Sequence, residues 1–193
     1  MEKYSIKMPE SVRLTDDEFF ALCQANRDLR FERNANGEII IMAPTGGITG
    51  KRNGKLSAKL DYWNEQHLLG EVFNSSTGFV LPNGATRSPD AAWVAKLRWE
   101  ALTYEQQEKF PPLCPDFVAE LTSPSDTLSA TQEKMDEWMS NGCRLGWLFY
   151  PKEEKTFIYR AGQDEPEELV GYDRLLSGEA VLSGFQFDLR WLK

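Results

Sequence analysis

The amino-acid sequence predicts an α/β fold, in which a sheet is covered by helices and lengthened by antiparallel strands. Several short runs have the character of strands and are separated by Gly, Pro and Asn, which are typical turn residues. Longer stretches repeat apolar residues every three or four positions, a spacing that gives a helix one buried face. Strands outnumber helices along the chain, and this order favours helices packed on a sheet.

The first element that we expect is a short helix near the N-terminus. Thr15 can cap this helix together with Glu18, which stands three positions later. A β-hairpin should follow, because the strand-like runs 31–33 and 38–42 flank Asn34-Ala35-Asn36-Gly37. Asn and Gly tolerate the positive φ of tight turns, so this tetrapeptide is well suited to the connection.

The middle of the chain predicts a helix and a set of strands. Leu56, Leu60 and Trp63 lie at helical spacing after the segment 44–50, so their side of the helix should cover one face of the sheet. Turn residues separate the strand candidates that come next. These predicted strands are 71–74, 79–81, 88–94 and 117–121.

The last third of the chain predicts a helix over 131–141, with Met135, Trp138 and Met139 as its buried stripe. Ser129 and Gln132 have the spacing of a cap at its start, and Asn141-Gly142 should end it. The regions that follow read as strands. They are 145–150, 155–160 and a strand-rich stretch over 181–192.

Size and composition favour a single domain over residues 1–193, with 41% hydrophobic residues. Cys23, Cys114 and Cys143 form no CxxC pair, which argues against a zinc site and against a disulfide framework. No segment has the roughly 18 apolar residues of a membrane helix, and residues 1–10 show no secretory leader, so we expect a cytoplasmic protein without a membrane partner. The net charge of −8 disfavours bulk binding to a polyanion, so any nucleic-acid contact must be local.

Two acidic residues, Glu120 and Asp90, lie in predicted strands whose other residues are mostly apolar and therefore expected to be buried. In the run 116–122 the even positions share one face, so Glu120 lies on the same face as Val118. Asp90 shares a face with Ala92 and Val94, at the point where its strand begins. Burying an unpaired carboxylate is costly, so such a residue needs a cation, hydrogen-bond donors or a raised pKa. One metal ion held by both carboxylates would satisfy them together.

These residues belong to a longer pattern. Ser88-Pro89-Asp90, the run Pro115 to Asp126 and Gln132-Glu133-Lys134-Met135 together resemble the Uma2 family (DUF820) of endonucleases. The similarity continues through Leu145-Gly146-Trp147-Leu148 and spans about residues 15 to 155. It implies the restriction-endonuclease-like fold of the PD-(D/E)XK superfamily, with a mixed central sheet flanked by helices and antiparallel β extensions at both ends.

The resemblance also implies roles for individual residues. In that superfamily an Asp and a Glu on adjacent strands bind Mg²⁺, and these correspond to Asp90 and Glu120. The catalytic lysine usually follows the Glu by two residues, where this chain has Thr122. In Uma2-like sequences the lysine stands on the next helix, and Lys134 occupies that place. Glu32 matches an acidic position early in the family, which implies an accessory contact to metal or water.

Each of these residues also has a purely structural interpretation. Asp90 could cap a turn after Pro89, and a salt bridge could hold Glu120. Lys134 could lie on a solvated helix face, and Glu32 could belong to an exposed hairpin. From the residue pattern alone these alternatives stay open.

Other signals are weaker. The segment Gly46 to Arg52 lacks the spacing of a phosphate-binding P-loop and has Arg52 in place of its hydroxyl residue. His67 is the only histidine, which disfavours a Ser-His-Asp hydrolase. Positive charge does gather just beyond the glycines, where it could meet a nucleic-acid backbone or simply face solvent. These basic residues are Lys51, Arg52, Lys55 and Lys59.

The leading hypothesis is therefore a Mg²⁺-dependent (or Mn²⁺-dependent) endonuclease that hydrolyses phosphodiester bonds of nucleic acid, in the first place DNA. Asp90 and Glu120 would be the metal ligands, and Lys134 would complete the catalytic set. The alternative is a catalytically inactive module of the same fold that binds a partner or forms a homodimer. A third hypothesis is nucleotide binding by residues 46–51.

Overall fold

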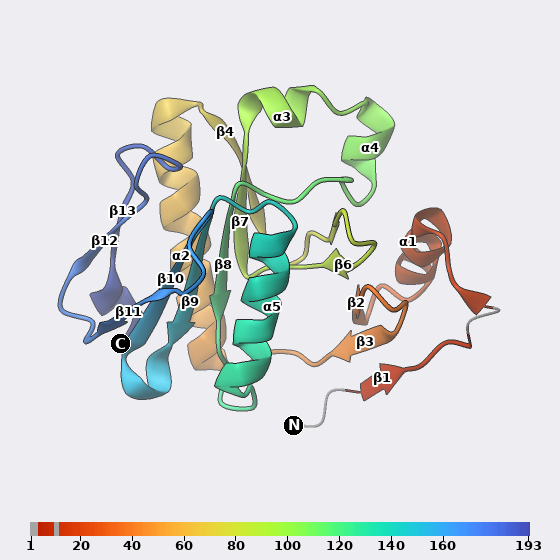
Figure 1. The fold of residues 1–193 in the computed structure, drawn as a ribbon, viewed down its shortest axis with the longest axis horizontal. Coiled ribbons are helices and arrows are strands. Elements are labelled where there is room, and N and C mark those ends of the chain that lie inside the picture. Colours follow the sequence, from red (N-terminus) through yellow and green to blue (C-terminus); the bar gives the residue numbers. More distant parts are fainter. Residues whose placement is uncertain (1–3, 10–11) are drawn as a thin grey trace.

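A six-stranded mixed sheet forms the centre of the computed structural model, which describes residues 4–9 and 12–193 (Figure 1). Residues 1–3, 10 and 11 lie outside the described residues, and they include part of the segment 1–10 on which the expectation about a secretory leader rests. Strands β8 and β9 run parallel, and all other neighbours in the sheet are antiparallel. In spatial order the strands are β11 (Glu167–Val170), β10 (Lys155–Arg160), β9 (Leu145–Tyr150), β8 (Phe117–Leu121), β7 (Ala91–Ala95) and β4 (Gly70–Asn74).

Two helices cover the opposite faces of this sheet. Helix α2 (Gly47–His67) packs Leu56, Leu60 and Trp63 against one face, as its apolar spacing predicts. Helix α5 (Leu128–Ser140) packs Met135 and Trp138 against the other. The odd residues of β8 belong to the α2 side and Val118 to the α5 side, so the alternation predicted for this strand is confirmed.

Capping residues determine where α5 begins and ends. Thr127 is its N-cap, and its side chain accepts a hydrogen bond from the backbone nitrogen of Ala130. The predicted cap at Ser129 is wrong, because the cap lies two residues earlier and Ser129 lies within the first turn of the helix. At the other end, Asn141 is the C-cap and Gly142 takes the positive φ of 104° that a glycine tolerates best.

A second, five-stranded sheet stands beside the central one, together with helix α1 (Asp16–Ala25) (Figure 1). The capping box of Thr15 and Glu18 is confirmed, because each side chain meets the other residue's backbone nitrogen. The predicted hairpin is confirmed as β2 and β3, which pair antiparallel across Asn34 to Gly37. The strands in order are β1 (Tyr4–Ile6), β3 (Ile39–Met42), β2 (Arg30–Arg33), β6 (Thr86–Arg87) and β5 (Phe79–Val80).

The C-terminal region contains less strand than the sequence predicts. Strands β12 (Leu175–Ser177) and β13 (Gln186–Asp188) form a two-stranded sheet, and a 3₁₀ helix, η3, covers Leu189–Leu192. The side chain of Asp188 caps this helix at the backbone nitrogen of Arg190, which ends the strand. The remaining short helices are α3 (Lys96–Glu100), α4 (Tyr104–Glu108) and the 3₁₀ helix η2 (Pro151–Glu153).

The fold is thus a mixed α/β sheet with a helix on each face and antiparallel strands added at its N-terminal and C-terminal sides, as the sequence predicts. Among the helices of the described residues, none combines the length and apolar character needed to cross a membrane.

Candidate active site

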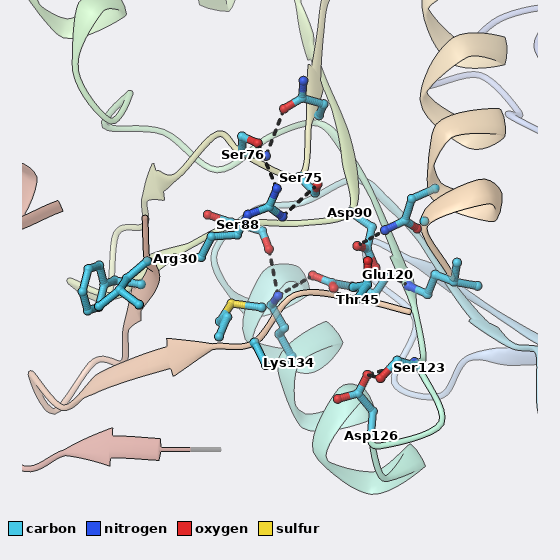
Figure 2. Close-up of a pocket in the computed structure, with 18 of the residues that line it drawn as sticks. Arg30, Thr45, Ser75, Ser76, Ser88, Asp90, Glu120, Ser123, Asp126 and Lys134 are labelled. Carbon is cyan, nitrogen blue, oxygen red and sulfur yellow. Dashed lines mark hydrogen bonds and ion pairs between the residues drawn. The ribbon is translucent and has the colours of Figure 1, made fainter. Parts of the chain in front are cut away.

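A pocket of about 810 Å³ opens where β7 begins and β8 ends (Figure 2). Its walls come from the first half of α2, from the start of α5, from the hairpin β2–β3 and from the turn after β4. Asp90, Glu120 and Lys134 all line it. The three residues that the sequence assigns to catalysis are therefore brought into one cavity, although 44 positions separate Asp90 from Lys134 along the chain.

Glu120 is the most enclosed of the three, with 5% of its surface exposed. Its Oε1 accepts a 2.9 Å hydrogen bond from the indole nitrogen of Trp138 and lies 3.0 Å from Lys134 Nζ. Burial raises the pKa of Glu120 to about 7. The positive charge of Lys134 lowers this pKa, whereas the negative charges of Asp90 and Glu32 raise it further. Near neutral pH both the protonated and the ionised form of this carboxyl are therefore populated.

Asp90 lies opposite Glu120. In the antiparallel pair of β7 and β8, Ala91 faces Ala119, and one further step in this register sets Asp90 against Glu120. The strand begins at Ala91, so Asp90 stands just before it and not within it as the sequence predicts. This position frees its carboxylate to reach two different elements.

Both oxygens of Asp90 are fixed by hydrogen bonds. The backbone nitrogen of Leu121 donates to Oδ2 at 2.7 Å, and the side-chain amide of Asn53 donates to Oδ1 at 2.6 Å. Burial nevertheless raises the pKa of Asp90 above its ordinary value, because it outweighs these bonds and the charge of Lys134. The interpretation of Asp90 as a turn cap is not supported, since its carboxylate bonds to β8 and α2.

Lys134 is clamped between two carboxylates. Its Nζ lies 2.8 Å from Glu32 Oε1 and 3.0 Å from Glu120 Oε1, and it donates a 2.9 Å hydrogen bond to the carbonyl of Ser88. Burial alone would lower the pKa of Lys134, but the charges of Glu120 and Glu32 raise it above its ordinary value. The amine is therefore a fixed ammonium ion. The solvated-face interpretation is wrong, because only 13% of this side chain is exposed.

Glu32 does not lie in an exposed hairpin, so that alternative is wrong as well. Only 4% of its surface is exposed, and its carboxylate meets the amine of Lys134 on α5. Besides Lys134, its carboxylate meets Arg87 at 3.1 Å and the backbone nitrogen of Ser88 at 3.1 Å. Burial opposes ionisation, but the charges of Lys134 and Arg87 lower the pKa of Glu32. Glu32 is thus an ionised anchor for the lysine.

Three further residues shape the site without having been assigned to it from the sequence. Asn53 holds Asp90, Trp138 holds Glu120, and Arg87 bridges Glu32 to Glu137 of α5. Trp138 is recognisable from the sequence only as a core residue. Asn53 and Arg87 carry no local signal, because each contacts a partner at least 37 positions away in the chain.

The basic residues after Gly50 do not gather in the pocket. Lys51 and Lys55 are exposed and do not line it. The amine of Lys59 lies over the ring of Trp191, 4.5 Å from the ring centre. The glycine-rich segment forms the N-cap and first turn of α2. Gln132 lies inside α5 and not at its cap.

The donor set suits a hard divalent cation. Within residues 4–9 and 12–193, no group of three or more His, Cys, Asp or Glu side chains is arranged to hold a metal. Mg²⁺, however, is commonly bound by one or two carboxylates, with water and substrate phosphate as the other ligands. Asp90 and Glu120 supply such a pair, and the raised pKa of each shows that the charges already present do not fully compensate the two carboxylates.

Comparisons with known proteins agree with this architecture. The crystal structure of "a putative nuclease belonging to DUF820" from Anabaena variabilis ATCC 29413 superposes with a TM-score of 0.76. It shares 20% sequence identity, and the match covers 93% of this chain and 99% of that chain, which shows a common fold. A search of curated proteins found no match. The model of the Uma2 family, described as "Putative restriction endonuclease", matches residues 16–190, and the chain therefore belongs to the Uma2 family.

Proposed function

We propose that this protein is an endonuclease that requires Mg²⁺ or Mn²⁺ and hydrolyses phosphodiester bonds of DNA. The observation that carries the proposal is the convergence of Asp90, Glu120 and Lys134 in one open pocket. Membership of the Uma2 family, whose description is "Putative restriction endonuclease", supports the reaction class and favours DNA as the substrate.

Asp90 and Glu120 would hold the cation. Each oxygen of Asp90 accepts one hydrogen bond, and both donors of Glu120, Trp138 and Lys134, meet its Oε1, so the oxygens of Asp90 and Oε2 of Glu120 keep lone pairs for a cation, since a carboxylate oxygen accepts two hydrogen bonds. When bound, such an ion polarises the phosphate and lowers the pKa of its water ligand. The role of Asn53 and Trp138 is to hold these two carboxylates in place.

Lys134 would supply fixed positive charge. Its raised pKa keeps it protonated, so it stabilises negative charge and does not serve as the base that removes a proton from water. Glu32 keeps the ammonium beside Glu120, where it would offset negative charge that grows on a phosphate bound at the two carboxylates.

The test is cleavage of supercoiled plasmid and of duplex oligonucleotides with Mg²⁺ or Mn²⁺. The variants are Asp90→Asn, Glu120→Gln and Lys134→Ala, and Asp61→Asn is a matched control, because Asp61 is exposed on α2 and outside the pocket. We expect each site variant to lose activity by about 100-fold or more, with the control unchanged. Wild-type rates in both Asp90→Asn and Glu120→Gln would refute the assignment.

A second candidate is a catalytically inactive binding or dimerisation module. The observation that favours it is the ion pair of Lys134 with Glu120 and Glu32, which balances part of the negative charge of these carboxylates without a metal. Calorimetric titration with Mn²⁺ distinguishes the two functions, because an inactive module of this kind takes up no stoichiometric ion. Sedimentation analysis with and without duplex DNA tests whether two copies associate.

A further inference from the structure

We propose that Arg30, together with Ser75 and Ser76, forms a second phosphate subsite in the same pocket. It would bind a phosphate of the substrate strand other than the one that is cleaved. The inference rests on the proposed nuclease function and specifies its substrate further: a polynucleotide strand with at least two phosphodiester groups, and not a single small diester.

Strand β2 places this subsite. Arg30 and Glu32 are two residues apart on β2, so their side chains leave the same face of the strand, about 6.6 Å apart along it. Glu32 reaches Lys134 at one end of the pocket, while Arg30 lines the pocket further along (Figure 2). The strand that anchors the catalytic lysine therefore also presents a guanidinium group.

The turn after β4 completes the subsite. The guanidinium nitrogens of Arg30 lie 3.4 Å from the hydroxyl oxygens of both Ser75 and Ser76. The turn is fixed by Asn74, whose side-chain oxygen accepts a 2.9 Å hydrogen bond from the backbone nitrogen of Ser76. A serine hydroxyl can donate as well as accept, so both hydroxyls can turn a hydrogen bond towards a phosphate oxygen held by Arg30.

The charge of Arg30 is available for a ligand. Among the described residues, no carboxylate oxygen lies within 4.0 Å of the guanidinium of Arg30, nor of Arg27, which lines the same wall. Six of the eleven arginines in this acidic chain are instead paired with carboxylates. Those paired arginines are Arg33, Arg87, Arg98, Arg144, Arg160 and Arg190.

The pocket therefore has two chemically different ends. One end holds Asp90 and Glu120, which repel phosphate unless a cation lies between them. The other presents unpaired guanidinium groups, whose planar donors match phosphate oxygens. A strand that lies across the pocket satisfies both ends at once, and binding energy gained at Arg30 then helps to hold the scissile phosphate at the carboxylates.

Binding is the first test. A fluorescent oligonucleotide is titrated against wild type, Arg30→Gln, Arg30→Lys and the control Arg174→Gln over a range of salt concentrations, with Ca²⁺ in place of Mg²⁺ or Mn²⁺ to keep a cation at the carboxylates while preventing cleavage. Arg174 is exposed, lies outside the pocket and changes charge equally. We expect Arg30→Gln to bind about tenfold more weakly and to reduce the slope of log K against log salt by about 1. Arg30→Lys should retain most of that slope.

Turnover of two substrates is the second test. Bis(p-nitrophenyl) phosphate carries one phosphodiester, so Arg30→Gln should hydrolyse it at the wild-type rate while its kcat/KM on an oligonucleotide falls by about tenfold. Equal losses on both substrates, or the wild-type salt slope in Arg30→Gln, would overturn the subsite and leave the nuclease proposal intact. A wild-type protein that neither binds nor cleaves nucleic acid would overturn both proposals.

Discussion

Lys134 Nζ lies 2.8 Å from Glu32 Oε1, and this contact joins helix α5 of the central layer to strand β2 of the smaller sheet. The same amine meets Glu120, so Lys134 contributes both to the contact between α5 and the smaller sheet, where Arg87 and Glu137 also meet, and to the geometry of the candidate active site. Removing this lysine should therefore change both stability and activity.

Lys134→Met tests that dependence. The substitution leaves Glu32 and Glu120 buried without their shared cation, and we expect it to lower the free energy of unfolding by about 3 kcal/mol and cleavage by about 100-fold. Urea unfolding followed by fluorescence gives the first quantity. Lys51→Met is the matched control, because Lys51 is exposed on α2. A loss of stability no larger than that of the control would show that the ion pairs of Lys134 with Glu32 and Glu120 do not stabilise the fold.

The pH dependence of stability follows from Glu120. Its pKa is about 7 in the folded protein against an ordinary value of 4.5, because burial favours the neutral form. Between these two values the folded state binds more protons than the unfolded state, so this contribution to stability is complete below pH 4.5 and is lost as the pH rises through 7. Melting temperatures of wild type and Glu120→Gln are measured from pH 4.5 to 8.5 without metal. Wild type should lose stability relative to Glu120→Gln as the pH rises through 7. A difference independent of pH would show that Glu120 is not neutralised by folding.

Trp138→Phe isolates the hydrogen bond to Glu120. Phenylalanine keeps most of the packing against β8 but lacks the indole donor that meets Oε1 at 2.9 Å. Loss of a hydrogen bond to a charged group should lower the free energy of unfolding by about 1.5 kcal/mol at pH 8, where Glu120 is ionised. At pH 5, where the carboxyl is protonated, the loss should be smaller. Trp99→Phe serves as the control, because Trp99 packs near α4 and away from Glu120. An equal loss at both pH values would mean that only packing is affected.

Asn53→Ala tests the positioning of Asp90. Without the 2.6 Å bond to Oδ1, the carboxylate keeps only its contact with the backbone of Leu121 and can rotate. We expect a reduction of about tenfold in cleavage at limiting Mn²⁺, with partial recovery as Mn²⁺ is raised. Ser57→Ala, one turn further along α2 and also at the pocket wall, should leave the rate unchanged. The proposed role of Asn53 fails if its variant has the same Mn²⁺ dependence as wild type.

Local patterns in the sequence predict the parts of this fold that depend on nearby residues. The alternation of β8 sets Glu120 on the α5 face, and the spacing of Leu56, Leu60 and Trp63 predicts the buried side of α2. Thr15 and Glu18 predict the first capping box, because both partners lie within one turn. The cap of α5 is missed since Thr127 and Ser129 are both acceptable cap residues, and packing of the helix decides between them.

Contacts between distant segments could not be predicted in the same way. Glu32 reads as part of an exposed hairpin, because nothing near it in the chain shows that its carboxylate meets Lys134 of α5. Arg87 and Asn53 reach the site through contacts across at least 37 positions. Lys134 is recognised through its family position alone, since a lysine on a helix is normally solvated.

The most direct measurement is calorimetric titration of Mn²⁺ into wild type, Asp90→Asn and Glu120→Gln at pH 8, where the carboxyl of Glu120 is ionised. We expect wild type to bind one ion per chain and each variant to lose most of that affinity, because one cation is held by both carboxylates. Unchanged stoichiometric binding in either variant, or no binding by wild type, would contradict the shared metal site.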